Sequence, residues 1–136
     1  YVRTSADLLS DHGYLETSAG LDTTKVGTVV EVMLEEFRKL AEQPLGEDEL
    51  RRTKDHLIGT LVIALETSDA LAEFYGEQEI AMRKISPPDE LARKIQAVTS
   101  QEVVSVAKEI FQNSKLNLAA VGPLKDPESL EKLLTL

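Results

Sequence analysis

Hydrophobic residues recur every three or four positions through most of the chain, and this period predicts a protein made largely of helices. The clearest stripe starts after Lys25 and comprises Val26, Val29, Val30, Met33, Leu34, Phe37, Leu40 and Ala41. Pro44 and Gly46 end this first helix. Later stripes predict five further helices, over residues 47–65, 70–85, 87–98, 99–111 and 126–134. In the helix over residues 99–111, we expect the inward side chains to be Val103, Val106, Ala107, Ile110 and Phe111.

Residues that favour helix ends stand at the boundaries of these stripes. Gly46 is placed to cap the second helix, and Ser86 to cap the fourth, with Pro87 at its first helical position. Thr99 and Glu102 match the capping box, in which each side chain accepts a hydrogen bond from the other residue's backbone amide. We therefore expect these helices to begin at their capping residues.

Two short stretches near the N-terminus, residues 1–9 and 13–21, predict an antiparallel hairpin. The turn residues Ser10, Asp11, His12 and Gly13 join them, and Gly13 tolerates a positive φ there. Residues 115–121 (KLNLAAV) predict a third strand that is apolar on both faces and therefore central. We expect an α+β fold in which several helices cover an antiparallel sheet, with residues 1–136 as a single domain.

Composition and charge exclude several kinds of partner. A net charge of −9 excludes nucleic acid as the expected partner, because phosphate binding requires clustered Lys and Arg. Apolar runs are far shorter than the roughly 20 residues that span a bilayer, so we predict a soluble protein with no membrane span. The absence of cysteine excludes disulfides and thiolate chemistry. It leaves the compartment undetermined, and bacterial cytoplasm and periplasm both fit.

Candidate chemical residues are few. Zinc peptidases of the H-E-x-x-H and H-x-x-E-H kinds place two histidines on one helix turn, whereas His12 and His56 are far apart in the chain. His12 and Glu16 are separated by about 13 Å along a strand, so we interpret them as turn and surface residues. Residues 67–69 (Thr-Ser-Asp) are interpreted as a helix break rather than a nucleophile site. We predict no catalytic, cofactor-binding or metal-binding residue in this chain.

A series of short motifs nevertheless runs in order along the chain. It comprises an opening Tyr1, a D-x-G…A-G strand (Asp11, Gly13, Ala19, Gly20), a P-[small]-E-x-E-L-like stretch at 44–54, an L-E-[ST] junction at 65–67, an A-V-T-x-E-x-V-like box at 97–103, shifted by one residue, and an A-V-G-P strand at 120–123. This series resembles the later half of the peptidase unit of the insulinase–pitrilysin zinc peptidases. That family includes the mitochondrial processing peptidases and bacterial processing-protease homologues.

The resemblance implies that residues 1–136 are the C-terminal part of such a unit, packed beside an N-terminal half or a paired homologous subunit. The family's zinc motif belongs to the earlier half, so zinc is expected there and no cofactor is expected in this chain. The stretch that usually precedes the opening tyrosine is missing, so we expect the chain to begin partway through a half. A fragment of this kind leaves a sheet edge and an apolar face uncovered, and we expect it to self-associate.

Three functions remain open at this stage. The chain is the C-terminal part of a zinc metalloendopeptidase that cleaves peptides or unfolded segments, to which it contributes chamber wall and substrate binding. Alternatively, it is the same part of a catalytically inactive partner subunit of that family. The third alternative is a free-standing helical interaction domain. An H-x-x-E-H motif upstream of Tyr1 would favour the first function over the second.

Overall fold

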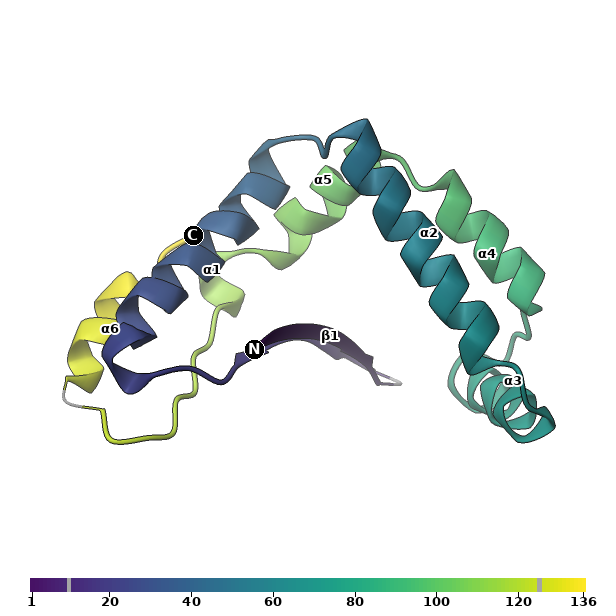
Figure 1. Cartoon of the computed structure of the whole chain (residues 1–136), viewed down its shortest axis with the longest axis horizontal. Coiled ribbons are helices and arrows are strands. Elements are labelled where there is room, and N and C mark those ends of the chain that lie inside the picture. Colours follow the sequence, from purple (N-terminus) through teal and green to yellow (C-terminus); the bar gives the residue numbers. More distant parts are fainter. Residues whose placement is uncertain (10, 125) are drawn as a thin grey trace. The chain divides into compact units, whose positions relative to one another are not determined.

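The computed structural model describes residues 1–9, 11–124 and 126–136, which cluster into two compact units. Unit 1 contains Tyr1–Arg3, Ser18–Leu45 and Thr99–Leu136, and unit 2 contains Thr4–Thr17 and Gly46–Val98. Six α-helices and one two-stranded sheet form the regular structure of the described residues (Figure 1). The predicted α+β class with an antiparallel sheet is therefore confirmed.

The sheet is the predicted hairpin, with strands β1 (Val2–Leu8) and β2 (Gly13–Ala19). At its open end, Tyr1 and Gly20 exchange main-chain hydrogen bonds of 3.1 and 3.2 Å. This exchange fixes the antiparallel register, because the two residues stand directly opposite each other. Every residue of β1 is exposed, so the hairpin itself buries little apolar surface.

The turn of the hairpin closes between Leu9 and His12, where the Leu9 amide donates to the His12 carbonyl over 2.8 Å. Ser10, which we predicted to open this turn, lies outside the described residues. Gly13 does not adopt the positive φ that a glycine tolerates in a turn, since Gly122 is the glycine with positive φ in the described chain. A Cβ on Gly13 would instead lie 2.9 Å from the carbonyl oxygen of Asp7. The close approach of the two strands therefore explains why a residue without a side chain occupies position 13.

The predicted third strand, residues 115–121, is wrong. The chain passes through the 3-10 helix η2 (Asn113–Lys115) and then continues without regular secondary structure. The alternation of apolar residues describes the faces of a strand, whereas a strand also requires a hydrogen-bonding partner along its edge. No strand of the described chain pairs with this stretch, because the sheet contains β1 and β2 alone.

Unit 1 is built around one long helix. Its helical elements are the 3-10 helix η1 (Thr23–Lys25) and the helices α1 (Val26–Glu42), α5 (Ser100–Ile110) and α6 (Pro127–Leu133). Helix α1 packs against both α5 and α6 (Figure 1). The buried side chains of the described residues are Val30, Leu34, Val104, Ala107 and Leu130. Phe37 stacks on Phe111 with ring centroids 4.5 Å apart, and no residue of the stripe predicted for α1 is exposed.

The buried face of α5 differs in part from the predicted one. We expected Val106 and Ile110 to point inward, yet their side chains are 54% and 41% exposed. Ala107 is buried as predicted, and Val104, which we did not place inward, is buried as well. The sequence of α5 carries apolar residues on two neighbouring stripes, and contact with α1 selects between them.

The C-terminal residues are tied to unit 1 through their main chain. The side-chain amide of Asn113 donates to the Leu136 carbonyl over 3.3 Å, and its oxygen accepts from the Leu136 amide over 2.7 Å. Arg38 donates to the Thr135 carbonyl over 2.9 Å. These bonds hold the last two residues against α1 and η2.

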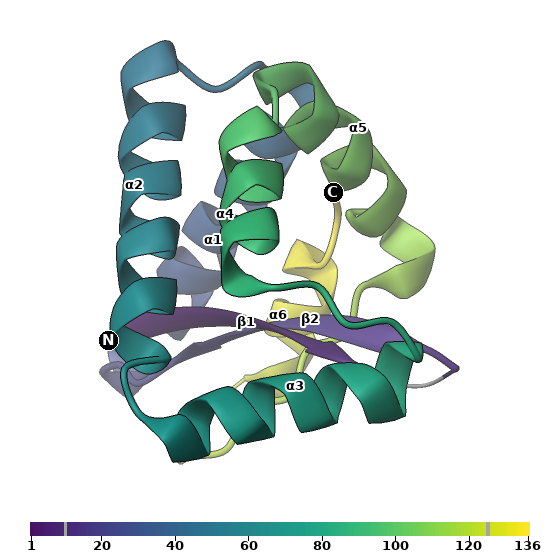
Figure 2. The same cartoon turned by 90° about the vertical axis from the view of Figure 1, so that its right-hand side faces the viewer.

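Unit 2 contains the helices α2 (Glu47–Ala64), α3 (Ser68–Met82) and α4 (Pro88–Ala97). Helices α2 and α4 lie side by side (Figure 2), and Lys54 of α2 donates to the Gln96 carbonyl over 2.9 Å. None of the described residues in this unit is buried. Unit 2 therefore lacks a closed hydrophobic core of its own.

Local capping signals predicted most helix starts. Gly46 is the N-cap of α2, and the capping box of α5 is present, with the Thr99 amide 2.7 Å from a Glu102 carboxylate oxygen. Helix α4 is the exception, because its N-cap is Pro87 rather than Ser86. A residue that precedes proline is kept out of the helical region, so Pro87 stays extended (ψ 154°) before Pro88.

No helix within the described residues combines the length and the apolar character that crossing a membrane requires. Helix α2, the longest of them at 18 residues, carries three acidic side chains in its first turn.

Candidate functional site

The two histidines stand apart from any cluster that could hold a metal. His12 lies in the hairpin turn with its Nδ1 2.6 Å from a carboxylate oxygen of Asp11, and both side chains are mostly exposed. His56 is exposed on α2. In the described part of the chain, no group of three or more His, Cys, Asp or Glu side chains converges as a metal site would require.

The predicted helix break at residues 67–69 has the local role that we assigned to it. Thr67 is the N-cap of α3, and its hydroxyl oxygen accepts a hydrogen bond from the Ala70 amide over 3.2 Å. Ser68 bonds weakly to the neighbouring Asp69, over 3.4 Å. These side chains are occupied in starting a helix.

Shifted pKa values occur at surface pairs. Hydrogen bonds from Thr24 lower the pKa of Asp22, which caps η1. Hydrogen bonds to Glu36 and Glu35 raise the pKa of Lys39, and the hydrogen bond from Lys94 lowers the pKa of Glu90. Asp22 and Lys39 are exposed and Glu90 is half-buried, and their partners are intrahelical or in a cap, so these groups stabilise local structure rather than mark an active site.

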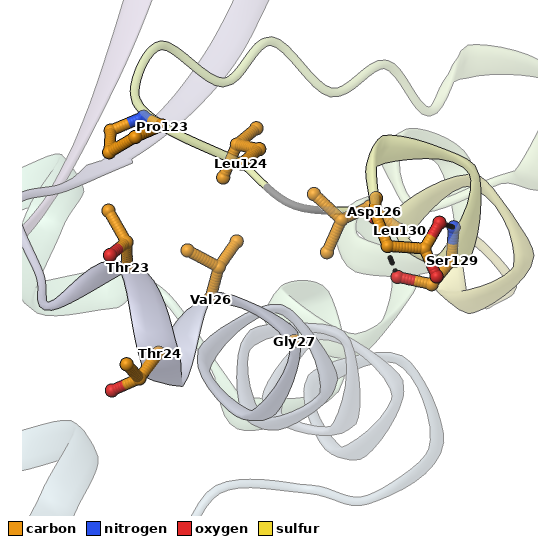
Figure 3. A pocket seen from close by; sticks show the side chains of 9 residues that line it. All are labelled: Thr23, Thr24, Val26, Gly27, Pro123, Leu124, Asp126, Ser129 and Leu130. Atoms are coloured by element: carbon orange, nitrogen blue, oxygen red, sulfur yellow. Dashed lines mark hydrogen bonds between the residues drawn. The ribbon is translucent and has the colours of Figure 1, made fainter.

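Unit 1 contains an open depression of about 370 Å³ between η1, the start of α1 and the chain that leads into α6 (Figure 3). It is lined by Thr23, Thr24, Val26, Gly27, Pro123, Leu124, Asp126, Ser129 and Leu130. Its one carboxylate, Asp126, accepts a hydrogen bond from the Ser129 amide over 3.1 Å and caps α6. The depression therefore offers apolar contact rather than acid–base chemistry.

A second depression, of about 250 Å³, adjoins the first and shares Leu124 and Leu130 with it. Its other lining residues are Leu118, Ala120, Glu131 and Leu134. Two of these come from residues 117–121, which we call the unpaired segment. The backbone amides and carbonyls of this segment form no hydrogen bond with any other described residue.

These depressions could not be found from sequence. They bring residues 23–27 together with residues 118–134, and no periodic pattern links two stretches that far apart. The nearest signal was the apolar run at residues 115–121, which we interpreted as a buried strand. In the described structure that run lines a hollow, with Val121 fully exposed.

Two residues of the motif series, Tyr1 and Gly20, contact each other at the open end of the hairpin, and this contact explains why each residue type stands there. The ring of Tyr1 lies over Gly20, so close that a Cβ there would be 2.5 Å from the ring. The glycine leaves room for the aromatic face, and the ring covers a backbone that lacks a side chain. The opening tyrosine and the closing A-G pair of the sequence series are therefore one packing unit.

Comparison with known proteins places the chain among peptidase relatives. No protein-family model matches it. An uncharacterized zinc protease of Streptomyces coelicolor is 29% identical over 120 residues, which is 88% of this chain and 26% of that protein. The mitochondrial-processing peptidase subunit beta of Blastocladiella emersonii is 34% identical over 90 residues, 66% of this chain and 19% of the relative. Subunit alpha-2 of the same peptidase in Dictyostelium discoideum is 28% identical over 123 residues, 90% of this chain and 27% of the relative.

The chain thus spans about a quarter of the length of the curated relatives that it matches. Both groups of relatives are those that the ordered motifs indicated, and the match runs through most of the chain. The resemblance is confirmed: this chain is related to the zinc proteases and mitochondrial processing peptidases of the insulinase–pitrilysin family and corresponds to a fragment of them.

Proposed function

We propose that this chain is the C-terminal, non-zinc-binding part of a zinc metalloendopeptidase that cleaves peptides or unfolded segments. It contributes chamber wall and substrate binding, while the zinc and the groups that activate water lie in another part of the enzyme. The observation that carries this proposal is the match to a zinc protease over 88% of the chain. The coverage of only about a quarter of that relative agrees with a part that works together with more polypeptide.

The exposed apolar side chains of unit 2 support the same proposal. Val62, Ile63 and Ile80 are 66%, 74% and 86% exposed, and Met82 is 63% exposed. Soluble monomers seldom leave several large apolar side chains of one region in water unless that surface meets a partner. In the proposed enzyme, the part that carries the zinc or a paired homologous subunit covers this surface.

A catalytically inactive partner subunit of the same fold is the second candidate. The observation in its favour is that named alpha and beta subunits of one peptidase both match this chain, over 90% and 66–71% of its length. Such a subunit would use the same residues for packing and peptide contact. The gene upstream of Tyr1 separates the candidates, because an H-x-x-E-H motif is required by the first and absent from the second.

Complementation in trans tests the contribution of this chain to peptide cleavage. The Streptomyces relative is expressed without the segment that matches this chain, and hydrolysis of an unfolded fluorogenic polypeptide is measured after this chain is added. We expect hydrolysis that requires both pieces and is lost on chelation of zinc. The matched control is the relative's own segment added in the same way. If that control restores cleavage and this chain leaves the truncated enzyme without it, the proposal is refuted.

A further inference from the structure

We draw no further inference here: the strongest candidate, the pair of adjoining depressions in unit 1 beside the unpaired segment, carries none, because the chain spans about a quarter of the length of its curated relatives and nothing in the structure shows whether a ligand or further polypeptide covers this surface.

Discussion

Close approach at single residues decides the geometry of the hairpin. At Gly20 the neighbour is the ring of Tyr1, a mostly exposed side chain that can rotate away. At Gly13 the neighbour is the carbonyl oxygen of Asp7, a main-chain atom that cannot move without shifting the strand. The same substitution therefore has different costs at two glycines of one element.

Gly13→Ala should lower the free energy of unfolding by roughly 1–3 kcal/mol, the usual cost of overpacking. Gly20→Ala should cost less, because the Tyr1 ring can turn aside. His12→Ala should change it by less than about 0.5 kcal/mol, since its contact with Asp11 is exposed. Urea unfolding of the three variants measures the order. A loss at His12 as large as that at Gly13 would show that close strand approach does not govern the turn.

The helical elements owe their positions to local chemistry. Apolar spacing and caps act within a few residues, so the period placed all six helices, and capping residues predicted the starts of α2 and α5. The strand that we predicted at residues 115–121 is absent, because a strand depends on a pairing partner that the local sequence does not reveal. The two depressions could not be predicted from the sequence either, because the residues that line them come from separate parts of the chain. The buried face of α5 was predicted only in part for the same reason, because contact with α1 determines which of two apolar stripes is buried.

The capping box of α5 gives a direct test of local stabilisation. Thr99→Ala removes the hydroxyl that accepts from the Glu102 amide, and we expect a loss of about 1 kcal/mol in the free energy of unfolding. Gln101→Ala, an exposed change in the same helix turn, is the matched control and should be neutral or slightly stabilising. Denaturant midpoints compare the two. Equal midpoints for both variants would mean that the cap does not limit the stability of α5.

Helix α4 should show a dependence of stability on pH through Glu90. The hydrogen bond and charge of Lys94, with smaller contributions from Ser86 and Lys84, lower the pKa of Glu90 below its usual 4.5. A lowered pKa in the folded state stabilises the fold above pH 4.5, and this stabilisation is lost as the pH falls through the lowered pKa. We expect Lys94→Gln to reduce the melting temperature at pH 7 and the melting temperatures of the two proteins to converge as the pH falls through the lowered pKa of Glu90. A constant difference across that range would contradict the assignment.

At the scale of the whole molecule, apolar surface and charge act against each other. Unit 2 has no buried residue in its described part and exposes several large aliphatic side chains, which favours association. A net charge of −9 opposes association between like chains, and salt screens that repulsion. Association should therefore depend on ionic strength as well as concentration.

Light scattering over a dilution series should give a mass above the 15.0 kDa of one chain, rising with concentration and with added salt. Ile80→Glu should lower that mass. The side chain of Ile80 is 86% exposed, and a glutamate in its place puts charge where apolar contact between chains would form. Ser105→Glu adds the same charge at an exposed polar position of α5 and serves as the control. A mass of one chain at all concentrations and salt levels would favour a self-contained domain.

The two hydrogen bonds between the side chain of Asn113 and the main chain of Leu136 also affect where the molecule can be labelled. Both the amide and the carbonyl of Leu136 are engaged by one side chain, and the carbonyl of Thr135 is engaged by Arg38. A dye or affinity handle attached at the carboxyl end would start from main-chain atoms that are already bonded, and its linker would compete for them. The hairpin turn has no such difficulty, because the side chain of Asp11 is 81% exposed. A cysteine introduced there would report binding elsewhere without disturbing the packed helices of unit 1.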